Sequence, residues 1–143
     1  MRLCPISPAL ALALALALAL VVPAQAQQFT TAAEVRPILE ATRANWVALR
    51  RWDGKELLYF THLESWRCGM AQVRFSVNSG AATRVWEMPP CLTGTASPHA
   101  VPADRLPYTD LPEDALQTVT VVVVLGDGTE LRQDYTREAI VMP

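Results

Sequence analysis

Residues 118-TVTVVVVL-125 carry the clearest structural signal in this sequence. In a strand, successive side chains point to opposite faces, so every second residue lies on the same face. One face of this segment is apolar throughout, and the other changes from threonine to valine along its length. Apolar side chains on both faces predict a central strand that is covered on both sides. At a sheet edge, the same segment would be a template for aggregation.

The chain after this segment is predicted to turn and return as its neighbour. Gly126-Asp127-Gly128 has the residue types of a tight turn, and Leu131 and Tyr135 would face inward on the returning strand. Residues 139–142 are apolar, and they are predicted to add a short last strand. The C-terminal part is therefore predicted to be antiparallel β-structure.

A second hairpin is predicted upstream. Val73, Phe75 and Val77 alternate with polar residues, which is typical of a strand with one buried face. Asn78-Ser79-Gly80 supplies turn residues, and residues 83–88 are predicted to return as the partner strand.

Two interpretations fit residues 45–51. They could extend a preceding helix, or they could form a strand that turns at Asp53-Gly54 and returns through residues 56–61. Asp-Gly between β-branched and aromatic flanks is a strong hairpin signal, so the hairpin is favoured. In that hairpin Phe60 and His62 would share one face of a strand.

One helix is predicted before these strands. Thr31 stands three residues before Glu34, which is the spacing of a capping box, and apolar residues follow at helical intervals. We expect a helix over residues 32–43.

The predicted fold is therefore mainly β, on the border of α+β: a small, antiparallel, sandwich-like domain of six or seven strands with one N-terminal helix.

Residues 88–112 form one long proline-rich loop in this prediction. Six of the eleven prolines of the chain lie there: Pro89, Pro90, Pro98, Pro102, Pro107 and Pro112. Structureless loops of this length are uncommon in compact domains and are often functional. A stiff crossover between two sheets and a partner-binding loop both fit this pattern.

Residues 1–26 have the pattern of a secretory signal peptide. Arg2 gives a positive start, residues 9–22 are an unbroken apolar run, and Ala24-Gln25-Ala26 is a small-residue cleavage motif. The run is shorter than the roughly 20 residues that a spanning helix needs. We expect cleavage after Ala26, a single exported domain over residues 27–143 without a membrane span, and a periplasmic or secreted location.

Cleavage would remove Cys4 and leave Cys68 and Cys91. An even number of cysteines in an oxidising compartment predicts a structural disulfide between them. A nucleophilic Cys68 with His62 as its base is the alternative, although no neighbouring residue type favours a thiolate. The two cysteines and two histidines lack the spacing of a zinc site, so no metal is expected.

Composition and motifs narrow the function classes. A chain that is 51% hydrophobic and 18% charged, with a net charge of −2, fits neither a disordered tail nor a basic nucleic-acid-binding module. No catalytic or phosphate-binding motif occurs, and we expect no cofactor and no catalytic residues. Three glutamates could in principle form a carboxylate pair, although solvated positions are expected for them: Glu56, Glu64 and Glu87.

Aromatic residues are the remaining candidates for a binding surface. The four tryptophans would first of all be core anchors, because a buried tryptophan gives a large apolar area. They could instead line an apolar groove for a ligand or peptide. The candidate binding residues are Trp66, Trp86, Tyr59 and His99, of which His99 is expected to be exposed in the loop.

A resemblance agrees with export. The run 57-LLYFTHL-63, followed by 66-WRCG-69, resembles short signal-peptide-bearing bacterial exported proteins of unknown function, and the similarity covers most of residues 27–143. It implies an exported protein but no activity, so it supplies no catalytic residue.

The sequence thus favours a non-enzymatic, exported binding module. The proline-rich loop and an edge strand would contact a partner such as an envelope protein. One alternative is a small hydrolase or redox enzyme that uses His62 with Cys68 or a nearby carboxylate. Another is a carrier of a small apolar ligand in an aromatic-lined groove.

Overall fold

The computed structural model describes residues 27–143, so the predicted signal peptide lies outside the described residues. Within these residues, seven strands form two antiparallel sheets, with the order β4-β3-β6-β7 in one and β1-β2-β5 in the other. The strands are β1 (Ala48–Trp52), β2 (Lys55–Tyr59), β3 (Met70–Val77), β4 (Arg84–Trp86), β5 (Tyr108–Pro112), β6 (Thr118–Leu125) and β7 (Glu130–Thr136). The helices are α2 (Ala32–Ala41), α3 (Thr61–Glu64) and α4 (Arg137–Ile140), with 3₁₀ turns η1 (Arg43–Asn45) and η2 (Arg67–Gly69). The prediction of a mainly β domain with two antiparallel sheets is confirmed.

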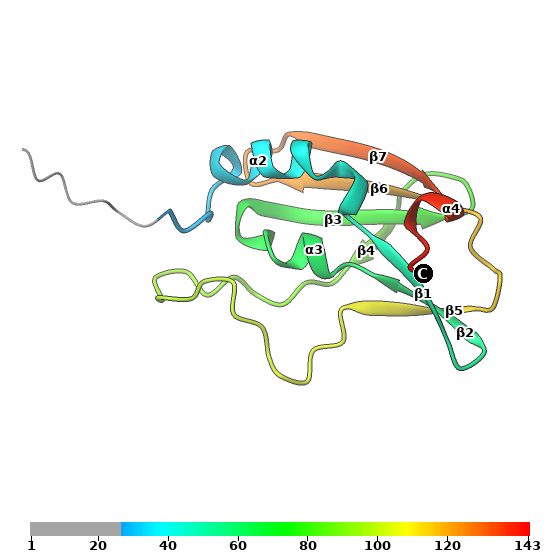
Figure 1. Ribbon diagram of the computed structural model, residues 1–143. Coiled ribbons are helices and arrows are strands. Elements are labelled where there is room, and N and C mark those ends of the chain that lie inside the picture. Colours follow the sequence, from blue (N-terminus) through cyan, green and yellow to red (C-terminus); the bar gives the residue numbers. More distant parts are fainter. Residues whose placement is uncertain (1–26) are drawn as a thin grey trace, which may run out of the picture.

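Strand β6 is central, as its sequence predicted. It pairs with β3 on one side and β7 on the other, so that Val121 lies opposite both Phe75 and Gln133. Val119, Val121 and Val123 are buried on the core face, and Val122 on the other face is also buried. In Figure 1, β3, β6 and β7 lie above β1, β2 and β5. Buried side chains of both sheets belong to one hydrophobic core, in which the rings of Phe60 and Phe75 lie 4.9 Å apart.

Helix α2 begins with the predicted capping box, in which Thr31 and Glu34 bond each other's backbone. It ends at Ala41, two residues before the predicted end, and the 3₁₀ turn η1 follows. Helix and core meet tightly at Gly69, where an added Cβ would lie 2.3 Å from Cγ2 of Val35. Only glycine allows this approach.

The hairpin predicted at Asp53-Gly54 is also confirmed, because β1 and β2 pair through residues 48–59. The prediction that His62 continues this strand is wrong. The ladder ends when the Phe60 N–H donates to Pro107 O, and residues 61–64 then form the short helix α3. Phe60 therefore stays in the core, and His62 leaves the sheet.

Two further predictions need correction. The last strand expected at residues 139–142 is absent from the described fold, where residues 137–140 form α4 and only Val141 makes a single parallel bridge to Leu49. The proline-rich loop is not structureless to its end, because residues 108–112 form β5 beside β2. Pro112 fits there because an edge strand does not need every N–H for pairing.

Candidate functional site

The most elaborate polar arrangement in the described residues holds the proline-rich loop against the sheets. We call residues 88–107 the pinned loop. It begins after β4, ends before β5, and carries Cys91, which forms a disulfide with Cys68; the two Cα atoms are 5.0 Å apart. The disulfide predicted from the sequence is therefore present, and it fixes the first part of the loop to η2.

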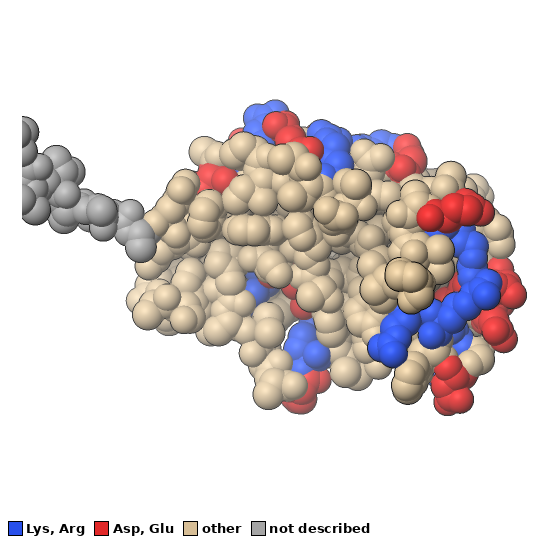
Figure 2. Space-filling view, in the orientation of Figure 1, with Lys and Arg blue, Asp and Glu red and all other residues tan. Residues whose placement is uncertain are grey.

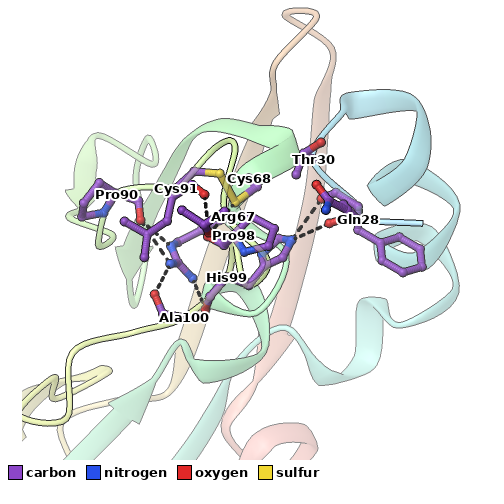
Figure 3. The surroundings of a disulfide bond; sticks show 12 residues. Gln28, Thr30, Arg67, Cys68, Pro90, Cys91, Pro98, His99 and Ala100 are labelled. Atoms are coloured by element: carbon purple, nitrogen blue, oxygen red, sulfur yellow. Dashed lines mark hydrogen bonds between the residues drawn. A yellow bond between two sulfur atoms is a disulfide. The ribbon is translucent and has the colours of Figure 1, made fainter. Parts of the chain in front are cut away.

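Arg67 is the second anchor of the pinned loop, and it is 97% buried because only 3% of its surface is exposed. Its guanidinium donates five hydrogen bonds of 2.7–3.3 Å to four backbone carbonyls. These carbonyls belong to Glu64, Pro90, His99 and Ala100. Figure 3 shows the guanidinium between the two arms of the loop. One side chain thus satisfies carbonyls from both arms, which a buried backbone requires.

His99 is the third anchor. Its Nε2 lies 3.2 Å from the carbonyl oxygens of both Gln28 and Phe29 (Figure 3). Because carbonyl oxygens only accept hydrogen bonds, Nε2 must carry the proton. The ring is half-buried and fixed to the N-terminal segment. The expectation of an exposed His99 is therefore wrong.

A buried ion pair closes the far end of the pinned loop. Glu64 is buried, and its Oε1 accepts hydrogen bonds from Arg105 Nη2 at 2.5 Å and from Trp86 Nε1 at 2.9 Å. The Arg105 guanidinium also lies 5.2 Å from the centroid of the Trp86 ring. The loop is therefore tied at its start, middle and end.

The predicted solvation of the glutamates is wrong for two of the three. Glu64 pairs with Arg105, and Glu56 is fully buried beside Arg137 and accepts a hydrogen bond from the Leu116 N–H at 3.1 Å. Glu87 is exposed as expected. The two buried carboxylates connect elements that are distant in the sequence, since each is paired with an arginine from a later segment.

The four aromatic candidates do not form one surface. Trp66 and His99 lie together beside the pinned loop with their ring centroids 6.4 Å apart. Trp86 stacks on Phe60 at 4.3 Å and is partly covered. Tyr59 lies on the other sheet against Tyr108 at 5.1 Å. A single aromatic groove through all four residues is therefore not formed.

His62 and Cys68 are also not brought together. Cys68 is in the disulfide, and the Nε2 atom of His62 lies 2.8 Å from Thr42 Oγ1. Within residues 27–143 no hydrogen bond joins His62 to a carboxylate, and no group of three or more His, Cys, Asp and Glu residues could hold a metal ion. In the same range, no helix has the length and apolar character needed to cross a membrane.

Sequence reasoning missed Arg67, which does more than any other side chain to hold the loop. Its residue type gives no signal, since several arginines among residues 27–143, such as Arg36 and Arg84, are exposed. The position of Arg67 in the sequence does give a signal. Arg67 directly precedes Cys68, and the predicted disulfide already places the start of the loop beside this segment.

Comparisons with known proteins identified no match to this chain among protein-family models, curated proteins or solved structures.

Proposed function

We propose that this protein is an exported, non-enzymatic interaction module and that the pinned loop is its contact surface. The observation that carries the proposal is a fixed backbone with exposed apolar side chains. Leu92, Val101 and Leu106 are 41%, 51% and 61% exposed, although the loop is anchored by the disulfide and Arg67. A fixed surface loses little conformational entropy when it binds, which favours association.

The chemistry of this surface favours a protein partner with apolar side chains. Residues 88–103 contain no lysine, arginine, aspartate or glutamate. Figure 2 shows few charged side chains on the side of the molecule where this loop lies in Figure 1. The two arms of the loop also form a shallow apolar depression of about 290 Å³, lined by Pro89, Pro90, Leu92, Ala100, Val101 and Pro102. An inserted apolar side chain is a common anchor of protein interfaces.

Export is the second part of the proposal. The signal-peptide pattern of residues 1–26 supports it. The Cys68–Cys91 disulfide adds support, because disulfides persist mainly outside the reducing cytosol. An envelope protein is the partner class that this location favours.

Site-specific photocrosslinking in intact cells tests the contact surface. A photoreactive residue at Thr93, which is exposed beside Leu92, is expected to capture a partner, whereas one at the exposed Arg36 on α2 is not. Adding Leu92→Ser and Leu106→Ser should reduce capture at position 93 about tenfold or more, because apolar interface anchors are lost. Both leucines are exposed, so the variant should keep its unfolding midpoint. Equal capture at both positions, or capture that the serine variants leave unchanged, would contradict the proposal.

A further inference from the structure

A separate cavity of about 560 Å³ opens between β1, the end of β2 and α3, with Met142 of the C-terminal tail at its wall. In Figure 1, the C-terminus lies beside β1, where the Leu49–Val141 bridge holds it. The volume falls in the range of about 300–1,000 Å³ that is usual for small-molecule sites. Ala48, Tyr59 and Met142 supply apolar surface. No residue of the pinned loop lines this cavity.

Arg50 gives the cavity its charge. It is the only charged side chain among the described residues of the lining, where His62 and Tyr59 are the other titratable groups. Its guanidinium lies 4.5 Å from the centroid of the Trp52 ring, and among residues 27–143 it takes part in no salt bridge, unlike the neighbouring Arg51, which pairs with Asp114. An unneutralised guanidinium beside an apolar cavity is suited to a carboxylate.

His62 adds a hydrogen-bond acceptor to the same lining. The Thr42 hydroxyl lies 2.7 Å from Ile38 O and 2.8 Å from His62 Nε2. Since the carbonyl only accepts, the single hydroxyl proton goes to Ile38, and His62 Nε2 must donate to Thr42. Nδ1 then keeps its lone pair and can accept a hydrogen bond. Burial lowers the pKa of His62, so the neutral ring prevails at neutral pH.

We propose that this cavity binds small hydroxylated aromatic carboxylates. The three parts of such a ligand match the three parts of the lining. The carboxylate pairs with Arg50, the hydroxyl donates to Nδ1 of His62, and the aromatic body packs against Tyr59 and Ala48. A carboxylate alone would leave the acceptor on His62 unused, because a carboxylate cannot donate.

Titration with three related probes tests this assignment. 6-Hydroxy-2-naphthoate carries both polar groups, 2-naphthol lacks the carboxylate, and 2-naphthoate lacks the hydroxyl. In amide NMR spectra of the intact protein, the complete ligand should shift signals of residues 46–50 and 59–62 and leave the pinned loop unchanged. We expect it to bind about tenfold more tightly than 2-naphthol and about fivefold more tightly than 2-naphthoate, given the usual strengths of charged and neutral hydrogen bonds.

Two variants should each remove one of these preferences. Arg50→Met should bind the hydroxy acid no more tightly than 2-naphthol, and His62→Phe should bind it no more tightly than 2-naphthoate. Arg36→Met, an exposed arginine on α2, is the matched control and should change neither preference. Ala48→Leu should weaken all three probes, because it fills part of the cavity while leaving the polar groups in place.

The native amide spectrum of each variant shows whether it is folded before its affinities are compared. Equal affinity of the wild-type protein for 2-naphthol and the hydroxy acid would overturn the proposal. Shifts of amide signals from residues outside the cavity lining would also overturn it. The absence of any shift with all three probes at millimolar concentration would do the same.

Discussion

Arg67→Met is expected to destabilise the protein by about 3–5 kcal/mol, which is a large share of the roughly 5–15 kcal/mol of a typical domain. The methionine fills much of the same volume but leaves four carbonyls without the donors that Arg67 provides. Each hydrogen bond from a charged group is worth about 1.5–3 kcal/mol, and water compensates part of that loss where it reaches the loop. Urea unfolding followed by tryptophan fluorescence measures the change.

Arg36→Met is the matched control for this prediction. Arg36 makes an exposed pair with Glu40 on α2, so its loss should cost less than about 0.5 kcal/mol. Arg67→Lys should lie between the two, because an ammonium group keeps the charge but cannot reach all four carbonyls in a planar fork. A loss for Arg67→Met as small as that of the control would show that the guanidinium does not hold the loop.

Glu56→Gln is the other substitution with a large expected effect, about 3 kcal/mol at neutral pH, because it leaves Arg137 without its buried counter-charge. The amide keeps the shape of the side chain and can still accept from the Leu116 N–H, so the change isolates the charge. Lys55→Met is the control, because Lys55 precedes Glu56 on β2. It breaks an exposed pair with Asp110 of β5 and should change stability by less than about 1 kcal/mol.

The pH dependence of unfolding gives an independent test of the same pair. Burial acts to raise the pKa of Glu56, but hydrogen bonds from Arg137 and Leu116 and the charges of Arg137 and Arg51 outweigh it and lower that pKa below its usual 4.5. A carboxyl with a lowered folded-state pKa stabilises the fold above its unfolded-state pKa and loses this contribution as the pH falls through the folded-state pKa. The wild-type protein should therefore lose more stability below about pH 4.5 than Glu56→Gln does. Parallel profiles for the two proteins would contradict the role assigned to Glu56.

The strands could be predicted because their hydrophobic pattern is local. Residues 118–125 are apolar on one face throughout and on the other face at their distal end, and in the described structure this strand has a neighbour on each edge and Val122 is buried on the second face. Asp53-Gly54 set the turn of the first hairpin in the same way, because both residues have positive φ there. The C-terminal helix α4 was missed because long-range contacts decide it. Arg137 is held by Glu56 and by Leu116 O, which apolar composition at residues 139–142 does not reveal.

The candidate site was less predictable for the same reason. Counting cysteines was sufficient for the disulfide, but nothing local distinguishes the buried Arg67 from exposed arginines such as Arg36. The buried Glu64 likewise cannot be told from a surface glutamate in the sequence, because its partner Arg105 lies 41 residues later. Buried charges are determined by the partners that compensate them, and those partners come from remote segments.

Backbone order parameters of residues 92–106 show whether the pinned loop is rigid enough to act as a preformed contact surface. We expect values near 0.85, similar to those of β3 and β6, because the disulfide, Arg67, His99 and Arg105 restrain the loop on the picosecond-to-nanosecond timescale. Relaxation measurements on the oxidised protein give these values. Order parameters below about 0.6 through this segment would contradict a pinned contact surface.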